Sequence, residues 1–145
     1  MDAPEPVRAL QLEICTLDRA PFRAEATLVS VPGTCGLFTV LPGHAPRMST
    51  LEIGVLKAVY ANGEQHLFAI SGGVVRVLDN QVLILTETAE RGADIDLARA
   101  EEARERAEQR LRQGGMDEAR AEIALKRAIA RIRARAQSSP PNNRS

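Results

Sequence analysis

The stretch Ile95-Asp96-Leu97-Ala98-Arg99-Ala100 marks the point where this 145-residue chain changes character. Before it lie all four aromatic residues, eight of the ten glycines and six of the eight prolines. After it, up to about residue 136, the sequence consists mainly of alanine and charged residues. Aromatic residues favour strands, whereas alanine, glutamate and arginine favour helices. The composition therefore predicts an α+β protein, with a β domain in residues 1–90 and a helical domain in residues 91–136.

Alternating apolar and polar residues predict short strands in the first ninety residues. Leu10, Leu12 and Ile14 alternate with polar residues, as in a strand with one buried face. Asn62-Gly63 and Asp79-Asn80 each separate two apolar runs, and both pairs are typical of tight hairpin turns. Strand signals recur about every ten residues and leave no room for crossover helices, so a parallel sheet is not expected. The pattern predicts an antiparallel β-sandwich or barrel.

Three further stretches qualify this prediction. Pro42-Gly43-His44-Ala45-Pro46 is expected to be a loop, because two prolines in five residues prevent regular strand pairing. Ser71-Gly72-Gly73 is another break, best interpreted as a bulge or tight turn, since it lacks the Lys-Ser/Thr of a phosphate-binding loop. The continuous apolar run in residues 82–85 is expected of a strand covered on both faces.

The helical domain is predicted to be an antiparallel hairpin. Asp94 is the expected N-cap of the first helix, Gly114-Gly115 ends that helix, and Asp117 begins the second. The two apolar stripes are Ala100, Ala103, Ala107 and Leu111, and Ala121, Leu125, Ala128, Ile132 and Ala136. Alanine removes little apolar area from water, so we expect the helices to dock weakly and to separate without melting. Residues 137–145 are predicted to form a disordered tail.

The bulk composition argues against several classes of protein. Net charge is zero, although residues 126–145 contain six basic residues and no acidic one. No apolar run approaches the roughly 20 residues that span a bilayer, and no export signal is apparent. Cys15 and Cys35 lack a CxxC spacing and are expected to be reduced thiols. Aromatic residues are too few for single-stranded nucleic-acid binding. His44 and His66 have no nucleophile motif nearby, so neither catalytic residues nor a metal site are predicted.

Four stretches, in this order and spacing, resemble the epsilon subunits of bacterial F-type ATP synthases over about residues 8–133. They are Gly43-His44-Ala45-Pro46, Ser71-Gly72-Gly73, Thr88-Ala89-Glu90-Arg91 and Ile95-Asp96-x-x-Arg99-Ala100. The resemblance implies a non-catalytic central-stalk subunit of a rotary, proton-transporting ATP synthase. Its β-sandwich would bind the gamma subunit and the ring of membrane c subunits. Its hairpin would lie compact on the sandwich or extend into the alpha/beta catalytic head and inhibit ATP hydrolysis.

The resemblance also implies a location and points to alternatives. The subunit would be peripheral, on the cytoplasmic face of the cell inner membrane, and would reach the membrane only through its partners. This chain has Leu37 at a position where relatives commonly have an acidic residue, in the loop that faces the rotor ring. If Leu37 and Phe38 are exposed, they would suit an apolar interface. The competing interpretations are a free-standing ATP-binding sensor and an interaction adaptor.

The resemblance finally implies ATP as a regulatory ligand of the compact form, with no other cofactor required. The candidate ligands carried over are Glu90, Ile95, Asp96, Arg99, Ala100, Arg106, Arg127 and Arg131. Arg127 and Arg131 are four residues apart, so they share one helix face and can clamp phosphates together. In an antiparallel hairpin they are expected near Asp96 and Arg99. The alternatives are that Asp96 caps the helix, that Arg99 and Arg106 belong to a solvated face, and that Glu90 only ends a strand.

Overall fold

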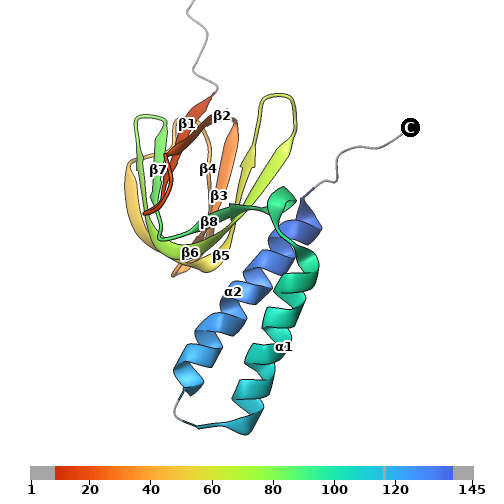
Figure 1. The fold of residues 1–145 in the computed structure, drawn as a ribbon. Coiled ribbons are helices and arrows are strands. Elements are labelled where there is room, and N and C mark those ends of the chain that lie inside the picture. The colour runs from red at the N-terminus through yellow and green to blue at the C-terminus, as the bar shows by residue number, and fades with distance from the viewer. Residues whose placement is uncertain (1–8, 116, 139–145) are drawn as a thin grey trace, which may run out of the picture.

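The chain folds into a curled β-sandwich followed by a hairpin of two helices (Figure 1). The computed structural model describes residues 9–115 and 117–138. The strands are β1 (Leu10–Cys15), β2 (Phe22–Ala26), β3 (Leu28–Gly33), β4 (Gly36–Val40), β5 (Arg47–Val59), β6 (Gln65–Leu78), β7 (Gln81–Leu85) and β8 (Ala89–Arg91). A 3₁₀-helix, η1 (Gly92–Asp94), leads into α1 (Leu97–Gln113) and α2 (Glu118–Gln137). The predicted α+β fold, a β-sandwich followed by an antiparallel helical hairpin, is confirmed.

The strands form one sheet that curls over itself. Its order is β2-β1-β7-β6-β5-β3-β4, and β8 pairs with β6 outside this path. β6 pairs with β5 along one edge, and along the other edge first with β8 and then with β7. Strand pairing in the described part of the chain is antiparallel except between β1 and β7, where Gln11 pairs with Gln81 in parallel. The prediction of purely antiparallel pairing is wrong here. It assumed that a connection between two parallel strands needs a helix, whereas the connection between β1 and β7 consists of the intervening strands.

Glycines allow β6 to bend in its middle. Ser71-Gly72-Gly73, predicted as a break, lies inside this strand. Gly72 and Gly73 have φ angles of 97° and 125°, which residues with side chains rarely adopt. A Cβ atom on Gly73 would also overlap the carbonyl oxygen of Leu85 on β7. The break is therefore a bend, and the residues on its two sides belong to one long strand.

The other turn predictions are largely confirmed. Asp79-Asn80 joins β6 and β7 with φ angles of 52° and 61°, as a two-residue hairpin turn requires. Asn62-Gly63 lies in the turn between β5 and β6, and the proline-rich stretch 42–46 is the loop between β4 and β5. The prediction that β7 is covered on both faces is wrong. Leu85 is 48% exposed, and only alternate residues of the strand are buried.

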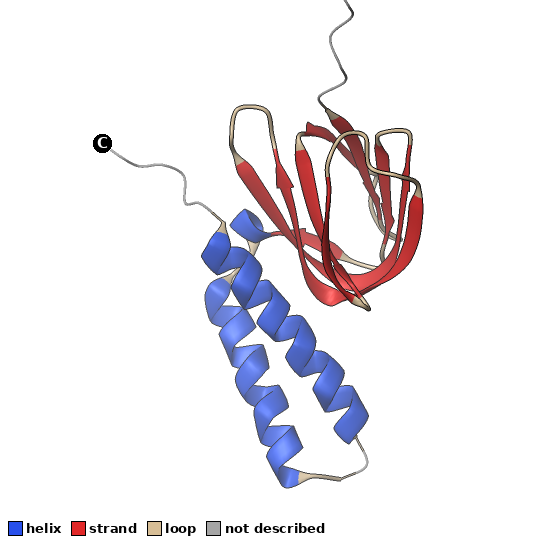
Figure 2. Ribbon diagram, turned by 180° about the vertical axis from the view of Figure 1, so that it is seen from behind, coloured by secondary structure: helices blue, strands red, loops and turns tan. Residues whose placement is uncertain are grey.

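The structure has two hydrophobic clusters. The larger one fills the sandwich and consists of strand residues: Leu10, Leu12, Ile14, Ala26, Val29, Val31, Val40, Leu51, Leu56, Ala58, Phe68, Ile70, Val75, Val77, Val82 and Ile84. The smaller one joins the hairpin to the sandwich and consists of Leu67, Ala69, Ile95, Ala100, Ala130 and Ala134. α2 packs on β5 and β6, α1 packs on α2, and the far end of the hairpin projects beyond the sandwich (Figure 2). The hairpin is therefore attached through one end of α2.

The helix ends differ from the prediction in one respect. Asp94 lies in η1, so its assignment as N-cap is wrong, and Asp96 caps α1 by accepting a hydrogen bond from the Arg99 amide at 3.2 Å. Gly114, with a φ of 74°, ends α1 as expected. α2 extends through Gln137, and the predicted tail lies outside the described residues from position 139 on. Within residues 9–115 and 117–138, neither helix combines the length and the apolar character needed to cross a membrane.

The seam between the helices is lined mainly by alanines, as predicted. Ala100, Ala107, Ala121 and Ala128 are buried there, whereas Ala136, assigned to the same stripe, is exposed. Arg104 lies between Ala100 and Ala107 on the same face of α1, and its Nε is buried without a hydrogen-bond partner among the described residues. An unpaired buried donor opposes docking of the two helices.

We expect the substitution Arg104→Met to stabilise the closed hairpin by about 1–3 kcal/mol, because methionine keeps an unbranched apolar stem and removes the unpaired donor. Hydrogen exchange of the α1 amides should become slower, because opening of the seam becomes rarer. Arg110→Met, at an exposed position of α1, is the matched control and should leave exchange nearly unchanged. Equal or faster exchange in Arg104→Met would contradict the role assigned to this side chain.

Candidate functional site

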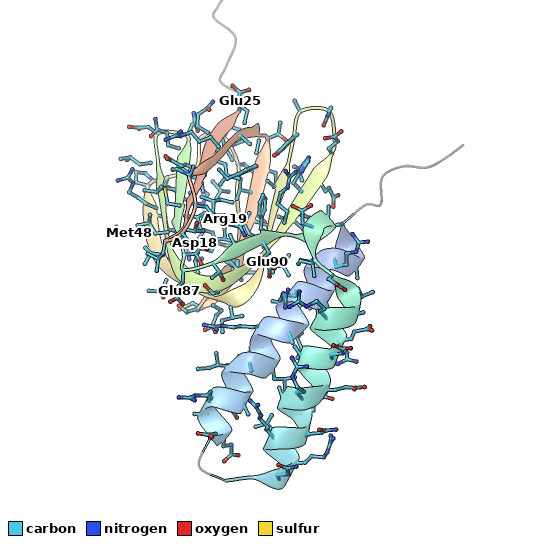
Figure 3. The ribbon with its side chains drawn as sticks, in the orientation of Figure 1. Asp18, Arg19, Glu25, Met48, Glu87 and Glu90 are labelled. Atoms are coloured by element: carbon cyan, nitrogen blue, oxygen red, sulfur yellow. The ribbon has the colours of Figure 1, made fainter. Side chains whose placement is uncertain are left out.

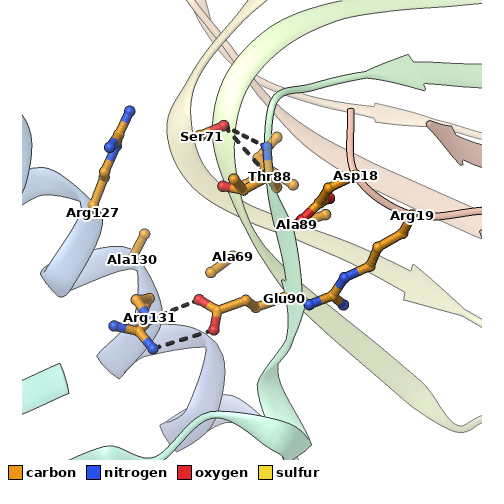
Figure 4. A pocket seen from close by; sticks show the side chains of 11 residues that line it. Asp18, Arg19, Ala69, Ser71, Thr88, Ala89, Glu90, Arg127, Ala130 and Arg131 are labelled. Carbon is orange, nitrogen blue, oxygen red and sulfur yellow. Dashed lines mark hydrogen bonds and ion pairs between the residues drawn. The ribbon is translucent and has the colours of Figure 1, made fainter. Parts of the chain in front are cut away.

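A cavity of about 390 Å³ lies between α2 and the sandwich. Figure 3 shows Asp18, Arg19 and Glu90 on the sandwich, and Figure 4 shows how Arg127 and Arg131 approach from the helix. The cavity is lined by Asp18, Arg19, Ala69, Ile70, Ser71, Thr88, Ala89, Glu90, Arg127, Ala130 and Arg131. Its volume falls in the range of small-molecule sites, roughly 300–1,000 Å³. This cavity is therefore large enough for a small-molecule ligand and is shared by the hairpin and the sandwich.

The strongest polar contact in the crevice joins Arg131 of α2 to Glu90 of β8. Arg131 donates a hydrogen bond from a terminal guanidinium nitrogen to Glu90 Oε2 at 3.2 Å, and its Nε lies 2.7 Å from Oε1. The Nε contact lacks hydrogen-bond geometry and acts as an ion pair. Both side chains are about one third exposed, so solvent screens the pair and its contribution is modest. The pair is one of the contacts that join α2 to the sandwich, beside the smaller hydrophobic cluster.

Arg127 lies one turn earlier on the same face of α2. Its guanidinium is 3.8 Å from Glu87 Oε1, and both side chains are more than half exposed. An exposed pair at that distance holds neither residue firmly. The cavity lining contains three arginines and two acidic residues, Asp18 and Glu90, so its formal charge is +1. Glu87 beside Arg127 offsets this charge, and Arg127 is held to it only loosely.

The sandwich wall of the cavity is held in place by hydroxyl groups. Ser71 Oγ accepts a hydrogen bond from the Thr88 amide at 2.9 Å and lies 3.3 Å from Thr86 Oγ1. These contacts tie the segment before β8 to the bend of β6. The Thr88 hydroxyl itself has no hydrogen bond within the part of the chain that the structure describes. It remains able to donate to a ligand.

The structure separates the candidate ligands into three groups. Glu90, Arg127 and Arg131 meet in the cavity. Ile95 and Ala100 are buried in the smaller hydrophobic cluster beside it. The remaining three, Asp96, Arg99 and Arg106, are exposed on the hairpin and do not line the cavity. The side-chain partners of Arg127 and Arg131 are Glu87 and Glu90 of the sandwich. Binding of ATP by this set remains a prediction.

Four residues that line the cavity are absent from the ligand set predicted from the sequence: Asp18, Arg19, Ser71 and Thr88. Ser71 and Thr88 belong to two stretches that carried the family resemblance, so their sequence context was a usable signal. Asp18 and Arg19 lie in the loop between β1 and β2, far from α2 in sequence. Only the curling of the sheet brings that loop to the crevice, and no local pattern indicates it.

The hinge between the sandwich and the hairpin packs closely against the end of α2. Arg135 donates a hydrogen bond to the Ala93 carbonyl oxygen at 2.9 Å. Gly92 is buried, and a Cβ atom there would overlap the carbonyl oxygen of Ala134 and Oγ of Ser138. The absence of a side chain at Gly92 therefore allows the docked arrangement.

Comparison with known protein families matches both parts of the chain. Residues 9–92 match "ATP synthase, Delta/Epsilon chain, beta-sandwich domain", and residues 93–136 match "ATP synthase, Delta/Epsilon chain, long alpha-helix domain". The ATP synthase epsilon chain of Moorella thermoacetica is 46% identical over 128 residues, which cover 87% of this chain and 96% of that protein. The ATP synthase epsilon chain of Nitratidesulfovibrio vulgaris is 47% identical over 106 residues, covering 73% and 78%.

Two solved structures share the fold at low sequence identity. A chain in the cryo-EM structure of the Euglena gracilis mitochondrial ATP synthase (OSCP/F1/c-ring) is similar with a TM-score of 0.78 and 24% identity. That similarity covers 90% of this chain and 88% of the other. A chain in the Tetrahymena thermophila mitochondrial ATP synthase central stalk/c-ring structure has a TM-score of 0.51 and 16% identity, covering 92% and 98%. Both support the arrangement of a sandwich followed by a hairpin.

Proposed function

This chain belongs to the family of ATP synthase epsilon chains, and on this basis we propose that it is a non-catalytic central-stalk subunit of a rotary F-type ATP synthase. It couples the catalytic head to the membrane rotor and inhibits ATP hydrolysis through its mobile hairpin. Catalysis resides in the alpha/beta head, and the whole assembly transports protons. The chain is peripheral, on the cytoplasmic face of the inner membrane, and its membrane association depends on its partners.

The sandwich provides the contacts to the gamma subunit and the c ring in this proposal. Leu37, Leu41, Met48 and Leu78 are large apolar residues that are between 41% and 71% exposed. The Arg47 guanidinium lies over the Phe38 ring, 3.7 Å from its centroid, and adds a cationic group to the same region. Met48 lies on the side of the sandwich away from the hairpin (Figure 3). Exposed apolar residues of this kind suit a protein interface.

The crevice between α2 and the sandwich carries the regulatory part of the proposal. Arg131 and Glu90 belong to the hairpin and the sandwich, so extension of the hairpin separates them. A ligand held by both parts binds only the compact state and shifts the population toward it. ATP therefore acts as a latch that keeps the hairpin away from the catalytic head.

The substitution Arg131→Ala is expected to weaken ATP binding by roughly 10- to 150-fold, because it removes a charge-assisted contact of about 1.5–3 kcal/mol. Calorimetric titration of the isolated chain with ATP measures the dissociation constant directly. Arg133→Ala is the matched control, since Arg133 is exposed on the same helix and does not line the cavity. The double substitution Glu90→Arg with Arg131→Glu preserves the ion pair and with it the docking of the hairpin. Loss of ATP binding in this variant would show that Arg131 contacts the ligand and does not act only by docking the hairpin.

The titration also tests the proposal as a whole. An unchanged dissociation constant in Arg131→Ala would exclude this residue as a ligand. Absence of binding to the unaltered chain up to millimolar ATP would leave the subunit assignment intact and remove the latch. In that case Ile95 to Ala100 would be a capped helix start, and control would rest on contacts to gamma and the head.

A further inference from the structure

We propose that the outer face of β1, β7 and the second half of β6 binds a second copy of this chain. The two copies are related by a two-fold axis that runs along β7. This pairing goes beyond the proposed function and concerns the chain before it joins other subunits. The order of charged and apolar side chains across the three strands supports it.

Strand alternation separates the two faces of these strands. The side chains that point into the sandwich are buried and are those of Leu12, Ile14, Val75, Val77, Val82 and Ile84. The residues between them point outward and are Glu13, Cys15, Val74, Arg76, Leu83 and Leu85. The hairpin packs elsewhere, on the first half of β6 through Leu67 and Ala69. Figure 1 shows β7 on the side of the sandwich away from the helices.

The strand register places three outward side chains in a row. Arg76 of β6 pairs with Leu83 of β7, and Leu83 pairs with Glu13 of β1. Neighbouring strands are about 4.8 Å apart, so Arg76 and Glu13 lie roughly 10 Å apart, at similar distances on either side of Leu83. The neighbouring row carries no charge and consists of Val74, Leu85 and Cys15.

The charged row is complementary to itself. A two-fold rotation about an axis along β7 exchanges the β6 side with the β1 side and leaves β7 facing β7. Arg76 of each copy then lies opposite Glu13 of the other, and the leucines of β7 meet at the axis. Two sheets that pack face to face keep their strands nearly aligned, as this axis requires. A symmetric dimer needs one patch that matches itself, whereas contact with a different protein does not.

The charged groups of the row are available for this pairing. Arg76 is exposed, and no acidic side chain within residues 9–115 and 117–138 forms an ion pair with it. Glu13 contacts Arg23 through Oε2 at 3.0 Å, which leaves Oε1 able to accept from a second arginine. Leu85, between the two charged positions, is 48% exposed. An apolar centre with charged groups at its edge is the usual layout of a protein interface.

The pairing also affects the surface assigned above to other subunits. Met48 is the neighbour of Arg76 on β5, and Leu78 is the neighbour of Gln81 on β7, so both lie beside the dimer contact. A paired chain is therefore blocked from gamma and the c ring. This consequence rests on the proposed function, whereas the pairing itself does not.

Sedimentation equilibrium of the full chain over a range of concentrations measures the dissociation constant of the dimer. Arg76→Glu places like charges opposite each other at both contacts, and Glu13→Arg does the same. Each substitution should raise the dissociation constant by roughly tenfold or more. Arg133→Glu, at an exposed position of the hairpin, is the matched control and should leave it unchanged. Circular dichroism checks that every variant is folded.

An equimolar mixture of the two single variants tests the two-fold geometry. In a pair that contains one chain of each variant, the substituted carboxylate faces the substituted guanidinium at one contact. The natural Glu13 and Arg76 face each other at the second contact. The mixture should therefore dimerise although neither variant does so alone. The double variant Arg76→Glu with Glu13→Arg should dimerise by itself, because both contacts again join opposite charges.

Three outcomes would overturn the proposal. The first is an unaltered chain that is monomeric at every concentration. The second is a dimer whose dissociation constant neither charge reversal changes, or whose single variants fail to pair in the mixture, because self-association would then use another face. The third is a monomeric chain in which Arg76→Glu weakens binding to gamma, because the face would then serve that subunit. Self-association is measured without other subunits, so its result is independent of the proposed function.

Discussion

Substituting Gly92 by alanine is expected to move the hairpin from the docked to the undocked state. A Cβ atom at this position overlaps the backbone carbonyl of Ala134, which cannot yield unless α2 shifts as a whole. Overpacking of this kind costs about 1–3 kcal/mol. The hairpin is held mainly by alanine contacts and partly exposed ion pairs, so a cost of that size is enough to change the population of docked chains by about 5- to 150-fold.

The undocked population can be measured as a distance distribution between two spin labels. One label is placed on Cys35, which is exposed in the turn between β3 and β4, and the other on Gln137→Cys in a chain that also carries Cys15→Ser. Gly92→Ala should broaden and lengthen the distribution. Gly115→Ala adds the same methyl group at the far end of the hairpin, where a Cβ meets no atom within 4 Å but a φ of 113° makes the turn strained. This control separates general strain in the hairpin from the clash at Gly92, and it should not lengthen the distribution. In the assembled enzyme, Gly92→Ala should hydrolyse ATP more slowly. A distribution identical to that of the unaltered chain would disprove the steric argument.

Removal of residues 94–145 is expected to abolish inhibition of ATP hydrolysis while leaving a sandwich that still binds gamma. The larger hydrophobic cluster consists of strand residues only, so truncation leaves it complete. The smaller cluster loses its helical half, which exposes Leu67 and Ala69, together with the partly buried Ile53 and Val55 that pack beside them. The truncated chain should therefore fold but associate more readily than the full chain.

Reconstitution with the remaining subunits tests this division of labour. Hydrolysis by the complex with the truncated chain should reach the rate of the uninhibited enzyme. Removal of residues 139–145 alone leaves both helices intact and should preserve inhibition. The proposal is wrong if the truncated chain is folded, as judged by circular dichroism, but no longer binds gamma.

The sequence indicates the docking face of α2 only in part. The spacing of Ala121 and Ala128 predicts the face toward α1, which the structure confirms. α2 carries a second alanine face, Ala130 and Ala134, which packs on the sandwich. Two alanine faces on one helix are hard to assign from periodicity, because alanine is compatible with burial and with exposure alike.

The features of the sheet and the crevice that could not be predicted depend on pairing between strands that are distant in sequence. Strand alternation and turn residues locate β1, β6 and β7, because those signals are local. The parallel pairing of β1 with β7 and the position of Arg19 beside the crevice depend on how the sheet curls. The i,i+4 spacing of Arg127 and Arg131 correctly predicts that they share a face, but the acidic partners of that face come from segments about forty residues earlier in the chain.

The parallel pairing of β1 with β7 also determines the order in which the chain can fold. Gln11 is among the first described residues of the chain, yet its partner Gln81 follows almost all of the other strands. Contacts between such distant segments are slow to form, whereas the contacts within a helical hairpin are local and fast. During synthesis β1 can pair with β2 early, but its other edge must wait for β7, until nearly the whole sandwich has left the ribosome. The two helices follow the sandwich in the chain and form quickly once they are synthesised, so completion of the sandwich limits the rate at which the regulatory hairpin acquires a surface to dock on.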